Sequence, residues 1–358
     1  MGSRKSVREK VTLADVGRVA RVSPSTASMI LTGREGVSFA GETVQRVLEA
    51  ADRLGYQMPA GRRRVRTPYD RQTVLIVSPN VHNPYYSAII QAIQQAAQAK
   101  NFDTLIYTTY RDLEKEINGL HLAEKADLAG IIFTMMAFPT EVIERINRKI
   151  PVVVIGDNNA ALGVDTVDLN NFSAGGLVAR HLIGLGHRHV AFISTPLNES
   201  NSARVRRLEG VQAVFREECP GGSVLVRSKA YSPLGELENV GIEHAVGFEM
   251  TRSCLADPRI TAFIAVNDMV AYGVLDAIHE AGKSVPGDYS VSGFDNIFPS
   301  HFSGVSLTTV EHFVEAKGRN AFDILHARMG GSASDHNITR VEFKSHLIVR
   351  ESTGEPGR

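Results

Sequence analysis

The residues best suited to molecular recognition lie near the N-terminus, between Ser23 and Ser28. Ser25, Thr26 and Ser28 carry short hydroxyl side chains, which both donate and accept hydrogen bonds. A helix surface that only faces solvent usually carries longer charged side chains. A face of short hydroxyl groups is instead typical of a helix that enters the major groove of DNA and contacts base edges.

Two short helices, each with its own start signal, are expected to position these hydroxyl groups. Thr12 caps the first helix with Asp15 three residues later, and Ser23 caps the second with Pro24 at its first position. The inward-facing apolar residues are Leu13, Val16, Val19 and Ala20 in the first helix and Ala27, Ile30 and Leu31 in the second. This succession predicts a helix-turn-helix, and two helices of an ordinary helical domain are the alternative.

A third helix and a basic segment complete the N-terminal region. Apolar residues recur at helical spacing from Val44 to Leu54, so residues 1–58 are predicted to form an α-helical DNA-binding domain. Residues 59–72 are predicted to be a basic hinge or linker, and its arginines are Arg62, Arg63, Arg64, Arg66 and Arg71. Residues 1–73 hold 14 lysine and arginine residues against 7 acidic ones, although the whole chain has 39 of each. This asymmetry suits contact with DNA phosphates, and a solvated linker without a partner is the alternative.

From Thr73 onward the pattern changes to short apolar runs that alternate with amphipathic helices. The runs lie at residues 74–77, 104–107, 130–133, 152–155, 190–193 and 263–266. Apolar strands separated by helices predict parallel sheets wound on both faces. Because this region is longer than one sheet usually needs, we predict two α/β lobes within residues 73–358, with a ligand between them.

Signals of enzymes, metal sites and secretion are missing from the sequence. We find no phosphate loop, dinucleotide fingerprint, zinc-protease motif or serine-hydrolase motif. His187-Arg188-His189 is interpreted as the end of a helix and the start of a strand rather than as a metal or acid–base site. The two cysteines, Cys219 and Cys254, are too few for a disulfide framework. We expect a cytoplasmic, nucleoid-associated protein that has no enzymatic activity, cofactor, metal or membrane partner.

Short motifs also follow one another along nearly the whole chain. They are Val11 to Val16, Val22 to Ser28, Leu54 to Tyr56, Asn83 to Tyr86, His181 to His187, Arg207 to Gly210, Val266 to Asp268, Ser290 to Asn296, Leu307 to Val310 and Val349 to Thr353. Each motif is weak alone, but in this order they resemble the lactose-repressor (LacI/GalR) family of bacterial transcription regulators.

The resemblance implies a homodimeric repressor or activator that binds a roughly palindromic DNA operator. Its second part would be a periplasmic-binding-protein-like effector domain, in which a small molecule, expected to be a sugar, changes the angle between the lobes. The DNA contacts carried over are Thr12, Ser23, Ser25, Thr26, Ser28 and Met29. The effector contacts carried over are Tyr86, Asp157, Asn170, Arg207, Asn267 and Asp295. A buried Arg207 that only pairs with Asp268 or Asp295 to fix the lobes is the alternative.

Several positions depart from the family pattern. Met29 stands where relatives often have an arginine, and Arg21 replaces the usual turn glycine, which requires either a positive φ or a different path. The hinge has no leucine to insert into the minor groove, so its expected DNA contacts are Arg62, Arg63, Arg64 and Val65. A sugar- or nucleoside-binding module without a DNA function remains the alternative for the whole chain.

Overall fold

The computed structural model describes residues 11–32, 39–54, 56, 72–135, 140–156, 162–198, 201–330 and 337–357. The chain divides into two compact units, Met1–Asp70 and Arg71–Arg358. Arg62, Arg63, Arg64, Val65 and Asp157, which were predicted to be site residues, lie outside the described residues.

The first unit contains three helices that close around one small core. They are α1 (Leu13–Ala20), α2 (Pro24–Thr32) and α3 (Gly41–Leu54). The core is formed by Val16, Ala20, Ala27, Ile30, Leu31, Val47 and Ala50, all of which are buried. Thr12 and Asp15 cap α1 reciprocally, each accepting a hydrogen bond from the backbone N–H of the other. The predicted helix-turn-helix and third helix are therefore present.

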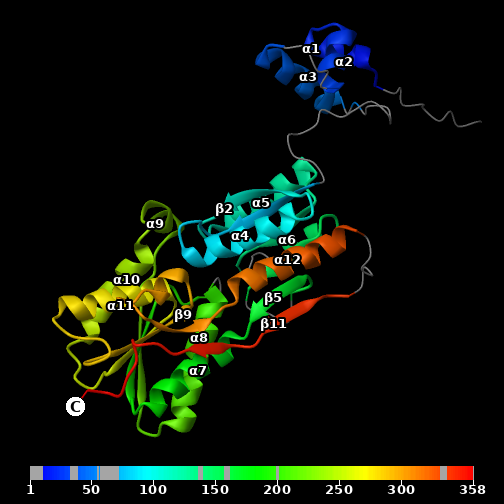
Figure 1. Cartoon of the computed structure of the whole chain (residues 1–358). Coiled ribbons are helices and arrows are strands. Elements are labelled where there is room, and N and C mark those ends of the chain that lie inside the picture. The colour runs from blue at the N-terminus through cyan, green and yellow to red at the C-terminus, as the bar shows by residue number, and fades with distance from the viewer. Residues whose placement is uncertain are drawn as a thin grey trace, which may run out of the picture. The chain divides into compact units, whose positions relative to one another are not determined.

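The second unit contains two six-stranded sheets, each in its own lobe (Figure 1). The N-lobe sheet has the order β11-β5-β4-β3-β1-β2 and all its strand pairs are parallel. Its strands are β1 (Thr73–Ser78), β2 (Asp103–Thr108), β3 (Gly130–Phe133), β4 (Val152–Ile155), β5 (Asp165–Leu169) and β11 (Arg340–Phe343). Its helices are α4 (Pro84–Gln98), α5 (Leu113–Ala126), α6 (Thr140–Asn147) and α12 (Val314–Met329).

The C-lobe sheet has the order β12-β10-β9-β8-β6-β7, in which only β12 runs antiparallel to its neighbour among the described strands. Its strands are β6 (His189–Ser194), β7 (Ser223–Ser228), β8 (Ala262–Ala265), β9 (Ser290–Asp295), β10 (Thr308–Glu311) and β12 (His346–Ile348). Its helices are α7 (Asn171–Gly184), α8 (Ser202–Glu218), α9 (Pro233–Glu238), α10 (Ile242–Cys254), α11 (Asp268–Glu280) and the 3-10 helix η2 (Phe298–His301).

Helices cover both faces of the sheets, as the apolar strand runs predicted. In the N-lobe, α4 and α12 pack together against one face, and α5 and α6 cover the other (Figure 1). In the C-lobe, α7 pairs with α8 and α10 pairs with α11. The prediction of doubly wound parallel sheets in two lobes is confirmed, and His187 and His189 do follow a helix and begin a strand.

The chain crosses between the lobes three times in the described residues. The crossings follow β5 at Asn170, β10 at His312 and Phe313, and β11 at Lys344 and Ser345. Short connections of this kind allow two lobes to rotate relative to each other while each keeps its own core.

The pair α7 and α8 packs so closely that two glycines are required at the contact. A Cβ atom on Gly175 would lie 2.0 Å from the Arg207 carbonyl oxygen, and one on Gly210 would lie 2.0 Å from the Phe172 carbonyl oxygen. Because backbone atoms cannot yield as a flexible side chain does, the two helices must separate to accept any larger residue.

Replacing Gly210 with alanine is therefore expected to lower the free energy of unfolding by about 1–3 kcal/mol or more. Urea unfolding of the full chain measures this change. Gly184→Ala is the matched control, since Gly184 also lies in α7 but has nothing within 4 Å of the point that a Cβ atom would occupy. That control should stabilise the protein by about 0.5–1 kcal/mol, and equal effects of the two substitutions would contradict the packing argument.

Candidate functional site

The N-terminal part of α2 presents a compact group of hydroxyl side chains. The Ser23 Oγ atom accepts a hydrogen bond from the Thr26 backbone N–H at 3.0 Å and lies 2.8 Å from Ser25 Oγ and 2.7 Å from Thr26 Oγ1. Ser23 and Ser25 are exposed, and Thr26, Ser28 and Met29 of α2 are half-buried. Ser23 thus caps α2 as predicted, and the accessible hydroxyl groups can also contact a phosphate or a base.

The turn before α2 depends on an arginine in a left-handed conformation. Arg21 has φ 57° and ψ 44°, and its backbone N–H bonds to the carbonyl groups of Gly17 and Arg18. Of the two possibilities raised by the missing turn glycine, the structure shows the positive φ. The turn keeps the helix-turn-helix path without glycine.

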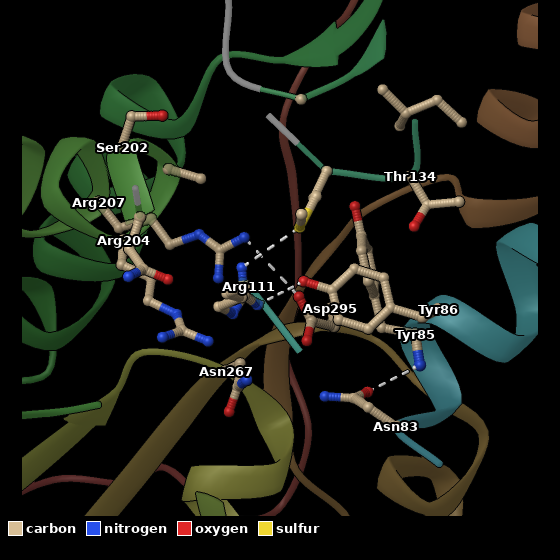
Figure 2. Close-up of a pocket in the computed structure, with 15 residues that line it drawn as sticks. Asn83, Tyr85, Tyr86, Arg111, Thr134, Ser202, Arg204, Arg207, Asn267 and Asp295 are labelled. Atoms are coloured by element: carbon tan, nitrogen blue, oxygen red, sulfur yellow. Dashed lines mark hydrogen bonds and ion pairs between the residues drawn. The ribbon is translucent and has the colours of Figure 1, made fainter. Parts of the chain in front are cut away.

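A second candidate site is a cavity of about 90 Å³ between the two lobes (Figure 2). It has room for several water-sized groups. Its described lining is Asn83, Tyr85, Tyr86, Arg111, Thr134, Met135, Ile155, Gly156, Asn201, Ser202, Ala203, Arg204, Arg207, Asn267 and Asp295. Seven of these fifteen residues lie at, or within three residues of, the carboxyl end of a parallel strand, where ligands bind in open α/β sheets.

Arg207 is the most extensively bonded residue of the cavity. Its guanidinium donates to the Val266 carbonyl oxygen at 2.6 Å and to Asn171 Oδ1 at 2.9 Å, and it lies 5.0 Å from the centre of the Phe294 ring. Its Nη2 atom lies 3.3 Å from His312 Nε2 and 3.8 Å from an Asp295 carboxylate oxygen. A side chain held by so many groups is fixed in one orientation before any ligand arrives.

Asp295 and His312 form the buried end of this arrangement. Burial raises the pKa of Asp295 well above its ordinary value against the opposing effect of Arg207, and the charge of Asp268 raises it further. Burial lowers the pKa of His312 well below its ordinary value, and the positive charges of Arg207 and Lys317 act in the same direction. A neutral His312 therefore lies at one of the crossings between the lobes.

Two glutamates of the C-lobe accept hydrogen bonds from polar side chains around the cavity. Glu243 accepts hydrogen bonds from Arg204 at 3.1 Å, from Asn267 at 3.0 Å and, across the lobes, from Asn83 at 2.7 Å. Glu236 accepts a hydrogen bond from the N-lobe residue Asn80 at 2.6 Å. These contacts hold the lobes together directly.

Arg111 joins the N-lobe side of the cavity to Glu236. Its Nη2 atom donates to the Tyr86 hydroxyl at 2.8 Å, and its Nε atom lies 3.7 Å from Glu236 Oε2. Burial alone would lower the pKa of Arg111, but the neighbouring Tyr86 and Glu236 raise it above its ordinary value. Arg111 therefore remains a cation inside the cavity.

The cavity brings together four of the six predicted effector contacts. Tyr86, Arg207, Asn267 and Asp295 line it, and Asp157 lies outside the described residues. Asn170 is not among the described lining residues, and its side chain caps α7 by accepting from the Ser173 N–H at 2.9 Å. The neighbouring Asn171 is the residue that contacts Arg207.

Sequence reasoning missed Arg111, Arg204, Glu236 and Glu243. Arg204 precedes Arg207 by three residues on one helix, so helical spacing places both on the same face. Arg111 follows soon after an apolar strand run, at the expected ligand edge of the sheet. Glu236 and Glu243 lie far away in sequence, and no local pattern pointed to them.

Comparisons with known proteins agree with this architecture. A family model described as a periplasmic binding protein-like domain matches residues 179–353. The HTH-type transcriptional repressor PurR of Histophilus somni is 27% identical over 344 residues, which cover 95% of this chain and 98% of that protein. The HTH-type transcriptional regulator PtxS of Pseudomonas putida is 28% identical over 349 residues, which cover 97% of each.

Solved structures show the same fold. The complex of the transcriptional regulator CelR with cellobiose aligns with a TM-score of 0.66 at 23% identity, over 96% of this chain and 100% of that one. A LacI family transcriptional regulator from Enterococcus faecium with bound ribose aligns with a TM-score of 0.66 at 24% identity, over 79% and 99%.

Two further features are absent from the described part of the chain. None of its helices has the length and apolar character needed to span a bilayer. Within the same residues, no group of three or more histidine, cysteine, aspartate or glutamate side chains is placed to hold a metal ion.

Proposed function

We infer that this chain belongs to the lactose-repressor (LacI/GalR) family and is a transcriptional regulator that binds double-stranded DNA and responds to a small molecule. The observation that carries the inference is the combination of a capped helix-turn-helix with a polar cavity between two lobes. The relatives named above are transcriptional repressors and regulators, which agrees with a role in binding rather than in catalysis.

On the DNA side, α2 is the recognition helix of the proposal. Ser25, Thr26, Ser28 and Met29 would face the major groove, where the hydroxyl groups reach base edges or phosphates and the Met29 side chain packs on a thymine methyl group. Thr12 and Ser23 would add phosphate contacts at the N-terminal ends of their helices. Residues 59–72 would form a hinge that contacts the DNA through Arg62, Arg63, Arg64 and Val65.

On the effector side, the ligand would bind between the lobes. Arg207, Asn267 and Asp295 offer donors and acceptors for hydroxyl groups, and Tyr86 offers an aromatic ring for the face of a sugar. Structures of relatives contain cellobiose or ribose, which supports a sugar-like effector for this chain. Because ligand contacts come from both lobes, the ligand would stabilise the closed arrangement and so change the affinity for DNA.

A homodimer is part of the same proposal. A single helix-turn-helix contacts one half-site, and the paired half-sites of an operator match a two-fold symmetric protein. Sedimentation of the full chain with operator DNA should show two copies for each duplex, and a monomer on the DNA would refute this part.

Selection of bound fragments from the source genome, followed by gel retardation at several salt concentrations, tests the DNA function. We expect specific retardation that weakens steeply as salt increases, because phosphate contacts release counterions. Ser25→Ala should weaken specific binding by a few-fold to about tenfold, the effect of one lost hydrogen bond.

Gln45→Ala, a substitution on the polar side of α3, is the matched control and should leave DNA affinity unchanged. If no genomic fragment is retained while small molecules still bind, the chain is a sugar- or nucleoside-binding module and the DNA function is wrong. If Ser25→Ala binds as tightly as the original protein, the assignment of α2 to the groove is wrong.

A further inference from the structure

The cavity contains more arginine than recognition of a neutral sugar requires. Arg111 enters from the N-lobe and Arg204 and Arg207 enter from α8, so three guanidinium groups line one small space (Figure 2). Asp295 is the single carboxylate among the described lining residues. Such a concentration of buried cations suggests that the ligand itself supplies negative charge.

Two of these guanidinium groups have unused donors. The Nη1 atom of Arg204 and the Nε atom of Arg111 are buried and have no hydrogen-bond partner within the described part of the chain. The Arg204 residue is only 7% exposed. An unsatisfied charged donor in a buried site is unfavourable, so Arg204 Nη1 is available to a ligand oxygen. Arg111 Nε lies 3.7 Å from Glu236 Oε2, which is an ion-pair distance but too long for a hydrogen bond, so a ligand oxygen could still accept from it.

The charges around the cavity are compatible with an anionic ligand. Glu243 contacts Arg204 and Glu236 lies beside Arg111, which balances two of the three arginines. The third, Arg207, faces Asp295, whose burial raises its pKa and so favours its neutral form. Lys317 adds a further positive charge that acts on Asp295 and His312, so the charges of the described residues favour an anionic group on the ligand.

We propose that the effector is a small polyhydroxy acid whose carboxylate binds between Arg204 and Arg111. A carboxylate has two oxygens, which match the two unused donors on these side chains. The hydroxyl groups of the same molecule would then reach Asn267 and Asp295, which line the same cavity. The inference rests on the proposed role of the cavity as the effector site and specifies the class of ligand.

Calorimetric titration of the full chain with matched pairs of compounds tests this class of ligand. The probes are aldonic and uronic acids of four to six carbons, the neutral sugars of the same carbon skeletons, and sugar phosphates. We expect at least one acid to bind on the order of tenfold more tightly than its neutral counterpart, as charge-assisted hydrogen bonds should provide. Tighter binding of the neutral sugar, binding of sugar phosphates alone, or binding of none of the acids would overturn the proposal.

Substitutions of the two arginines test where the carboxylate of the ligand binds. Arg204→Gln and Arg111→Gln should each bring the ratio of acid to neutral affinities towards one, and Arg204→Lys should keep part of the preference. Arg216→Gln, an exposed arginine in the same helix α8, is the matched control and should leave the ratio unchanged. If Arg204→Gln does not fold, Arg111→Gln decides alone, and an unchanged ratio in the folded variants would overturn the carboxylate position.

Gel retardation on the selected genomic fragments separates failure of this inference from failure of the regulator function. If the protein retains DNA but no acid binds, the ligand class is wrong and the DNA function stands. If an acid binds the cavity but no DNA is retained, the ligand class stands and the regulator function is wrong.

Discussion

Replacing Arg207 with methionine is expected to abolish the effector response and to lower the free energy of unfolding by about 3–5 kcal/mol, the usual effect of removing one partner of a buried ionic network. The Arg207 side chain donates to Asn171 and to the Val266 carbonyl oxygen, and it contacts His312. Without it, the Val266 carbonyl oxygen and the Asn171 amide lose this donor in a buried site.

The consequence for ligand binding follows from the same contacts. Arg207 presents a fixed guanidinium to the cavity, and its bonds span α7, α8 and the crossing at His312. Loss of the side chain would therefore disturb the crossing between the lobes at His312 as well as ligand binding. Urea unfolding measures the stability, and calorimetry with the best-binding acid or sugar measures the response.

Arg206→Met is the matched control for this substitution. Arg206 neighbours Arg207 in α8, but it is half-exposed, pairs with Glu209 at 2.7 Å and lies over the Phe172 ring. Its replacement should change stability by no more than about 0.5 kcal/mol. If Arg207→Met had the same ligand affinity and the same free energy of unfolding as Arg206→Met, Arg207 would contribute neither to ligand binding nor to stability.

The sequence predicted those parts of the fold whose burial is purely apolar. The strand runs at residues 130–133 and 152–155 coincide with β3 and β4, because both are covered on both faces and carry only apolar side chains apart from a glycine. The strand β5 has two aspartates and was not predicted, although all five of its residues are buried. Its Asp165 is compensated by Arg328 of α12 at 2.6 Å, a tertiary contact that hydropathy does not reveal.

The candidate site, like the fold, was predicted only in part from the sequence. Arg207, Asn267 and Asp295 were predicted from the family resemblance, and they do converge on one cavity. The contacts that hold the lobes together join residues that are far apart in sequence, such as Asn80 and Glu236. These depend on how two separately folded lobes meet, and no periodicity within either lobe encodes that information.

Breaking the contact between Glu236 and the N-lobe is expected to open the two lobes in the ligand-free protein. The described partners of Glu236 are Asn80, at 2.6 Å, and Arg111, at 3.7 Å, and both belong to the other lobe. A hydrogen bond to a charged group contributes about 1.5–3 kcal/mol. Glu236→Ala should therefore shift the ratio of open to closed molecules by about tenfold or more, and Glu236→Gln, which keeps the bond to Asn80, should shift it less.

Spin labels on the two lobes measure the opening in the full chain. Glu114→Cys in α5 and Arg216→Cys in α8 supply exposed thiols, whereas the natural Cys219 and Cys254 are buried and should not react. The distance between the labels should increase in Glu236→Ala and return to its original value when a ligand binds. The ligand affinity should be weaker than in the original protein, because closing the opened lobes now costs part of the binding free energy.

Glu249→Ala is the matched control, because Glu249 pairs with Lys229 inside the C-lobe and is exposed. It should leave both the distance between the labels and the ligand affinity unchanged. If the distance between the labels is unchanged in Glu236→Ala, the apolar cores and the chain crossings determine how far the lobes close. The polar contacts between the lobes would then form as a result of closure and would not cause it. A longer distance with a matching change in DNA affinity would identify lobe closure as the step that couples the cavity to the DNA-binding helices.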